Sequence, residues 1–117
     1  MDEKSKRAMG MIKAVYEEGV ATINGRDYVF TAIPHRKRLK VFAFFTEHQE
    51  SVQNNNWSFL GLPEWDAVQK LICSAVTFEN SALTKKPTHW DDYPEDFLMF
   101  VSTALGVFSY PFLRGAQ

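Results

Sequence analysis

Residues 20–33 carry the sequence VATINGRDYVFTAI, in which Asn24-Gly25 separates two runs of β-branched and aromatic residues. Asn-Gly is the strongest local signal for a two-residue hairpin turn, because both central residues of that turn need positive φ angles. The sequence therefore predicts two antiparallel strands, at residues 20–23 and 28–33. Apolar side chains occur on both faces of the second strand. We therefore expect a helix layer on one face, and either a further layer or a second chain on the other.

Helical periodicity dominates the sequence on both sides of this hairpin. Gly19 is placed to end a leading helix, Pro34 to begin the next one and Pro111 to stop the last one. Apolar residues recurring at steps of three and four predict the helices themselves. These helices cover residues 1–18, with a start that can fray, and residues 35–49, 62–76 and 94–109. The connection before the last helix allows a short strand at residues 75–78 or 82–84.

The length and element order fit one domain of the α+β class. A chain of 117 residues lies near the usual size of a single domain, so we assign residues 1–117 to one domain. Within it, residues 20–33 form the β-hairpin and residues 35–117 the helical remainder. The expected fold is therefore mostly helical, with its hairpin in the N-terminal third.

The charge and the cysteine content exclude several classes of function. Thirteen Lys and Arg against fourteen Asp and Glu leave a net charge of −1, so no overall positive field attracts nucleic acid or an anionic membrane. The single cysteine, Cys73, cannot close an intramolecular disulfide, and its place near an apolar stripe favours an inert core thiol. No apolar run approaches the roughly 18 residues of a membrane span, so we expect a cytosolic protein without membrane contact.

The densest group of chemically capable side chains is acidic. Four carboxylates within six residues could hold a metal ion or act as general acid and base. The simpler interpretation is that they cap the last helix at its positive dipole end. The histidines are far apart in sequence and favour surface or helix-end positions over a metal site. We therefore assign no catalytic, cofactor-binding or metal-binding residue and expect no enzyme; the residues weighed are Asp91, Asp92, Glu95, Asp96, His35, His48 and His89.

One local basic run opens the second predicted helix. Cations are electrostatically disfavoured in the first turn of a helix, which suggests that something acidic offsets them. Three interpretations stay open: a solvated helix face, contact with an acidic protein partner, and contact with nucleic acid phosphates. The residues concerned are His35, Arg36, Lys37, Arg38 and Lys40, and we take Arg36, Lys37 and Arg38 as candidate partner-binding residues.

Aromatic residues are unusually frequent. Ten Phe, four Tyr and three Trp make 15% of the chain, and each ring can bury roughly 150–250 Å². A domain of this size is expected to expose part of this set, which favours a homo-oligomer or a client-binding surface over a core-only role. The rings that we assign to partner binding are Phe42, Phe44, Phe45, Trp90, Phe100 and Phe112.

A series of short motifs, spread over residues 20–114, resembles one known family. In chain order the motifs are TINGRDYVF (22–30), AIP (32–34), GLPEW (61–65), HWDD (89–92) with EDFL (95–98), and YPFL (110–113). Their order and the elements around them are similar to those of the tail assembly chaperones of long-tailed bacteriophages.

This resemblance implies a non-enzymatic protein without cofactors. Such chaperones bind the tape measure protein, keep it soluble and help to recruit the tail tube protein, often as homo-oligomers. The resemblance places the protein in the host cytoplasm and not in the mature virion, with a frameshifted longer form in many members. The alternative from the residues alone is a small nucleic-acid-binding regulator that uses the basic patch at residues 35–40.

Overall fold

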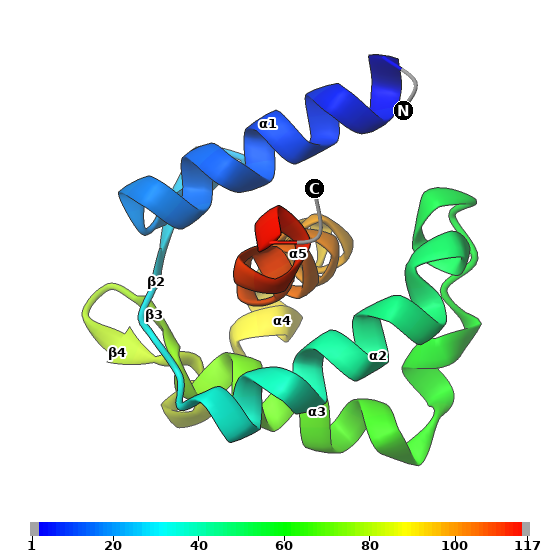
Figure 1. Cartoon of the computed structure of the whole chain (residues 1–117). Coiled ribbons are helices and arrows are strands. Elements are labelled where there is room, and N and C mark those ends of the chain that lie inside the picture. The colour runs from blue at the N-terminus through cyan, green and yellow to red at the C-terminus, as the bar shows by residue number, and fades with distance from the viewer. Residues whose placement is uncertain (1–2, 116–117) are drawn as a thin grey trace.

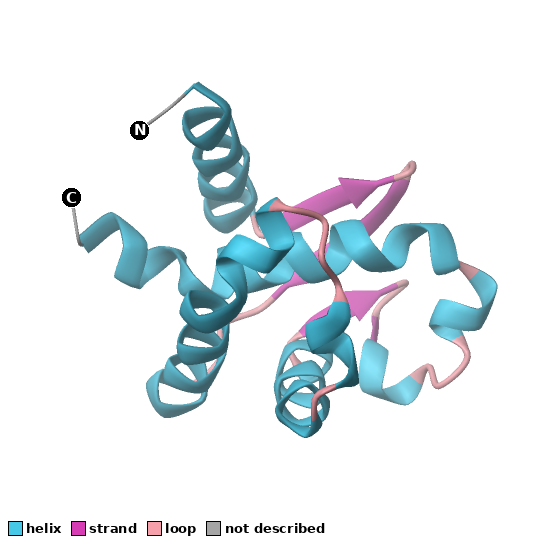
Figure 2. Cartoon of the chain, turned by 90° about the vertical axis from the view of Figure 1, so that its right-hand side faces the viewer, coloured by secondary structure: helices cyan, strands magenta, loops and turns pink. Residues whose placement is uncertain are grey.

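The computed structural model describes the backbone of residues 3–115 and the side chains of residues 7 and 9–114. It confirms the α+β class: the molecule is mostly helical, and its strands form one narrow sheet (Figures 1 and 2). The helices are α1 (Glu3–Glu18), α2 (His35–Gln53), α3 (Pro63–Ser74), α4 (His89–Asp92) and α5 (Phe97–Gly115). The strands are β1 (Val20–Ile23), β2 (Arg26–Phe30), β3 (Val76–Phe78) and β4 (Ser81–Ala82). Three 3₁₀ turns complete the order: η1 (Ser58–Gly61), η2 (Leu83–Lys85) and η3 (Pro94–Asp96).

The sheet is antiparallel, in the order β1-β2-β3-β4. Asn24 and Gly25 have φ angles of 52° and 80°, so the predicted hairpin turn is confirmed. The second strand ends at Phe30, three residues earlier than predicted, and a strand at residues 76–78 confirms one of the two expected positions. On β2, Tyr28 and Phe30 are buried, whereas Val29 is exposed. Within the described chain, the outer face of the hairpin therefore has no second layer.

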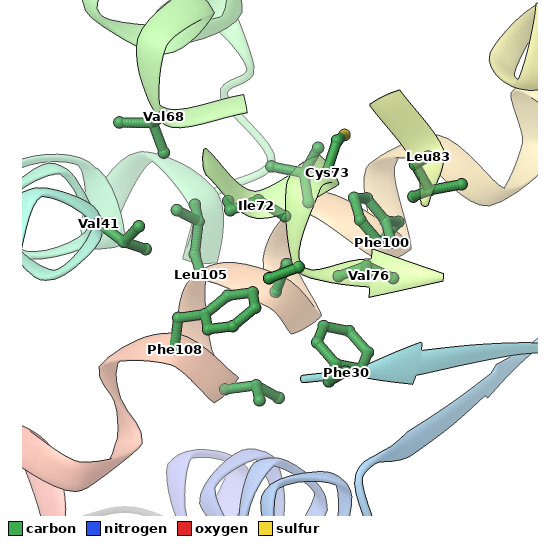
Figure 3. Packing of buried hydrophobic residues seen from close by; sticks show 14 of the residues in the cluster. Phe30, Val41, Val68, Ile72, Cys73, Val76, Leu83, Phe100, Leu105 and Phe108 are labelled. Atoms are coloured by element: carbon green, nitrogen blue, oxygen red, sulfur yellow. The ribbon is translucent and has the colours of Figure 1, made fainter. Parts of the chain in front are cut away.

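Helix α5 forms the centre of the molecule. Figure 1 shows it nearly end-on, between α1 on one side and α2 on the other. Figure 3 shows side chains of α2 and α3 meeting Leu105, while Phe100 and Phe108 of α5 lie next to Phe30 of β2. The expectation that no apolar run approaches the length of a membrane span is wrong, because by length and composition alone Pro94–Arg114 is apolar enough to cross a membrane. Its burial in the core of this fold accounts for that composition.

The ends of α5 differ from the sequence prediction. The helix begins at Phe97 after the η3 turn, and it continues through Pro111 to Gly115 instead of stopping there. A proline inside a helix removes one backbone hydrogen bond and costs free energy. Packing beyond the proline offsets this cost: the Phe112 ring lies 4.7 Å from the Phe42 ring of α2.

Gly106 allows α1 to approach α5 closely. A Cβ at this position would lie 2.7 Å from the Ile12 Cδ1 atom, closer than side chains tolerate. One turn further along, the rings of Tyr16 and Tyr110 are 5.1 Å apart. Gly106 looks like a weak point in the sequence because glycine lowers helix propensity. In the fold it is the contact point of the two helices.

Candidate functional site

The aromatic residues do not form an exposed binding surface. All seventeen rings lie in the described part of the chain, where nine are buried and eight are half-buried. Phe44 and Phe100, which the sequence assigned to partner binding, are only 5% and 2% exposed. Both are core residues, so this fold offers neither ring to a partner. The expected surplus of exposed rings is therefore wrong.

The other four predicted aromatic contacts are half-buried and already packed. Phe42 and Phe112 lie against each other, and the Trp90 ring is 4.9 Å from the Phe100 ring. Phe45 packs against the edge of the core. The large apolar side chains that do reach solvent in the described chain are aliphatic: Met11, Val29, Leu39, Leu62, Leu98 and Met99.

The basic run at the start of α2 is accessible and not neutralised. Arg36, Lys37 and Lys40 are exposed, and the half-buried Arg38 has a buried Nε atom without a hydrogen-bond partner. None of these four cations forms an ion pair with any described residue, and the first turn of α2 has no acidic residue. The positive end of the helix dipole therefore adds to an uncompensated positive charge. This surface is suited to an acidic partner.

Beside the basic run lies an open groove of about 800 Å³. It is bounded by the start of α2, by α3, by η2 and by α4, which run next to one another in the lower part of Figure 1. Apolar atoms of Leu71, Leu83 and Trp90 line it, and Lys37 and Lys70 stand among its lining residues. A groove with apolar side chains and cations can hold an amphipathic, acidic ligand.

Cys73 also lines this groove, and the sequence prediction of a core thiol is confirmed. The side chain is 7% exposed, and burial raises the pKa of the thiol to about 11. At neutral pH the thiol is protonated, which makes it a poor nucleophile.

A second site, which the sequence did not predict, is a buried polar network centred on Asp96. One carboxylate oxygen accepts hydrogen bonds from the Asn24 amide at 2.7 Å and from the Arg26 guanidinium at 2.9 Å. The other accepts the Tyr28 hydroxyl proton at 2.6 Å. Asp96 is fully buried, so the network joins the hairpin to the entry of the central helix. We call these residues, together with His89, the Asp96 network.

His89 completes this network from α4. Its Nε2 atom lies 2.9 Å from the Tyr28 hydroxyl oxygen. Because the Tyr28 proton is donated to Asp96, the His89 Nε2–H group donates to the phenol oxygen. His89 is the first residue of α4, which fits the expected helix-end position, but it is 5% exposed, so the alternative of a surface position is wrong. Local spacing could not place it, because its partner Tyr28 is 61 residues away in sequence.

Burial and hydrogen bonding set the charge states of the network. Burial alone would raise the pKa of Asp96, but hydrogen bonds from Tyr28, Asn24 and Arg26 and the Arg26 charge lower it below its usual range. Burial also lowers the pKa of His89, against the attraction of Asp96. An ionised Asp96 and a neutral His89 are therefore the native forms at neutral pH.

The geometry of the Asp96 network favours a structural role. Tyr28 and Asp96 are both 0% exposed, so a substrate cannot reach the Tyr28 hydroxyl or the Asp96 carboxylate oxygen that accepts its proton. Asp96 lies in the first turn of η3 at the entry of the last helix, as predicted, but its oxygens accept hydrogen bonds from side chains of the hairpin and so do not cap the helix. Within the described residues, no group of three potential ligands is arranged to hold a metal ion.

The buried neutral His89 makes folding stability depend on pH. Below pH about 6.5 the unfolded chain binds a proton at His89 and the native chain does not, so stability falls as pH falls. The slope for one proton is at most about 1.4 kcal/mol per pH unit. Urea denaturation between pH about 7.5 and 5.5 measures it. In His89→Gln we expect a lower stability but a flatter pH profile; an equally steep profile would assign the proton uptake to other groups.

Comparison of the chain with protein-family models, with curated proteins and with solved structures gave no match.

Proposed function

We propose that this protein is a non-enzymatic tail assembly chaperone of a long-tailed bacteriophage. In this role it binds the tape measure protein, keeps it soluble and helps to recruit the tail tube protein. The observation that carries the proposal is the contrast between the two sites. The accessible site is an apolar groove beside unpaired cations, which suits the binding of a polypeptide. In the Asp96 network, by contrast, the Tyr28 hydroxyl and the Asp96 carboxylate that share a proton are fully buried.

The positions of the resemblance motifs give further support. The TINGRDYVF motif supplies Asn24, Arg26 and Tyr28 to the Asp96 network, and the HWDD and EDFL motifs supply His89 and Asp96. Motifs that are 60 or more residues apart in sequence thus meet in one structural unit. Such an arrangement is expected of motifs that maintain a common fold, and less of motifs that match by chance.

The proposal is tested by co-expression with the tape measure protein of the same phage. We expect the tape measure protein to be largely soluble and to co-purify when this chain is present, and to aggregate without it. An unchanged soluble fraction and no co-purification would contradict the proposal. The proposal also places the protein in the host cytoplasm and not in the mature virion, with self-association into a homo-oligomer. Light scattering and analysis of purified virions test these two points.

A nucleic-acid-binding regulator is the second candidate, because the exposed cations of the basic run form no ion pair with the residues that the structure describes. Contacts with phosphates would give an affinity that falls steeply with salt. A gel-shift titration at several salt concentrations distinguishes this candidate from the chaperone, which is expected to show no complex at physiological salt.

A further inference from the structure

We propose that the groove between α2, α3, η2 and α4 binds one face of an amphipathic helix that carries carboxylates along its flank. This inference rests on the proposed client-binding function and names the chemistry of the segment that is bound. The groove has a volume of about 800 Å³, which lies within the range of roughly 300–1,000 Å³ that is usual for ligand pockets. The groove is open to solvent, so a segment of another chain can reach its lining residues.

The apolar part of the groove is suited to aliphatic or aromatic side chains. Leu83 belongs to the core, but its surface lines the groove, together with the half-buried Leu71 and Trp90. These side chains come from three different elements, α3, η2 and α4, and together they form the apolar floor of the groove. A helix recognised in such a groove uses residues at i, i+3, i+4 and i+7 as anchors.

The charges around the groove determine which helix is favoured. Lys37 and Lys70 line it, and Asp66 is the carboxylate that lines it within the described chain. Neither lysine forms an ion pair with a described residue. Because Arg36 and Lys40 lie on the same helix as Lys37, the α2 side of the groove is positively charged. Glutamates beside the apolar anchors would meet the two lysines, whereas a basic helix would be repelled.

The floor of the groove favours a polypeptide over nucleic acid. Phosphate binding needs cations, but it does not need an apolar floor made largely of leucine side chains. Binding of single-stranded nucleic acid also uses several stacked aromatic rings. Trp90 is the aromatic residue that lines this groove in the described chain.

The test uses a designed peptide and not the natural client. The probe is a labelled helical peptide of about 18 residues, with leucines on one face and glutamates beside them. Two control peptides have the same leucines with lysines in place of the glutamates, or the same composition with the leucines scattered around the helix. Fluorescence anisotropy with the full chain gives the affinities, and amide chemical shifts from NMR locate the contact.

Two variants change the groove without touching the buried core. The double variant Lys37→Glu and Lys70→Glu reverses the charge of two exposed lysines that line the groove. We expect it to bind the acidic peptide at least about tenfold more weakly. Ser74→Trp adds a ring from an exposed position that lines the groove, which should abolish binding by filling it. Lys13→Glu on α1 is the matched control, and its affinity should stay within about twofold of the original. Circular dichroism checks that each variant is folded.

Several results would overturn the inference. These are equal affinity for the lysine-flanked peptide, no effect of either groove variant, chemical shifts away from α3 and η2, or displacement of the peptide by an oligonucleotide. Dissociation of a homo-oligomer by Ser74→Trp would instead assign the groove to a second copy of the chain.

Solubility of the co-expressed tape measure protein distinguishes failure of the groove inference from failure of the proposed function. If Ser74→Trp still solubilises it, the groove inference fails alone; if the peptide binds but the tape measure protein aggregates, the proposed function fails alone.

Discussion

Replacement of Asp96 by alanine is expected to destabilise the fold by about 3 kcal/mol, because three side chains lose a fully buried, charged hydrogen-bond acceptor. The carboxylate is fully buried and accepts hydrogen bonds from Tyr28, Asn24 and Arg26. Alanine leaves the buried Tyr28 hydroxyl without its acceptor and leaves a void beside it. Since small domains are stable by about 5–15 kcal/mol, much of the total stability is lost. Urea denaturation followed by circular dichroism measures the change.

The neighbouring carboxylate Asp91 provides the control. It is exposed and belongs to the same acidic segment, so Asp91→Ala should change stability by no more than about 0.5 kcal/mol. Asp96→Asn keeps the shape and an acceptor oxygen, and its loss should lie between these two values. If helix capping were the role of Asp96, Asp96→Ala would cost only about 1 kcal/mol. A result of that size would contradict the network.

The parts of the fold that follow local rules could be predicted from the sequence. The Asn24-Gly25 turn forces a hairpin because it selects positive φ angles, and the structure has those angles. Pro34 and the spacing of apolar residues placed α2 and α3 to within a few residues. These signals depend on neighbours within about four positions, which any single sequence displays.

The Asp96 network could not be predicted, because its contacts are not local. Asp96 sits within a run of carboxylates that have the composition of a helix N-terminus, and nothing nearby distinguishes it from Asp91 or Asp92. Its partners Tyr28 and Asn24 are 68 and 72 residues away. The extension of α5 beyond Pro111 has the same origin, since the contact between Phe112 and Phe42 of α2 outweighs the local stop signal. Tertiary contacts override local preference in each case.

The interpretation of the aromatic residues failed for a different reason. Composition counts rings but does not show how they pair, and Trp57 and Phe59 lie outside every helix and strand that the sequence predicts. In the fold these two rings are 5.8 Å apart, and Phe59 also meets Phe44 and Trp65. Rings that shield one another need less core volume than rings buried separately. Because the rings are packed inside the fold, the candidate binding surface is formed by the groove and the basic run. The sequence predicted the basic run but not the groove.

Phe100→Ala is the second change with a large expected effect, a loss of about 3–5 kcal/mol in the free energy of unfolding. The ring is 2% exposed and contacts the rings of Tyr28, Phe30 and Trp90. Its removal leaves a cavity at the junction of the sheet and α5, which the tightly packed neighbours cannot fill. Phe112→Ala is the matched control. Phe112 is half-buried near the end of α5, so the loss there should be about 1 kcal/mol.

Comparison of Phe100→Ala with Phe112→Ala also distinguishes a folding role of the aromatic residues from a binding role. If Phe100 is a core residue, its loss lowers the unfolding midpoint, and binding of the acidic peptide returns to normal at temperatures where the variant is folded. If Phe100 were a partner contact, as its place in an aromatic-rich sequence first suggested, the variant would keep its stability and lose its client. Measuring stability and peptide affinity on the same samples distinguishes the two cases, because a ring enclosed by three others contributes to binding only through the fold that it stabilises.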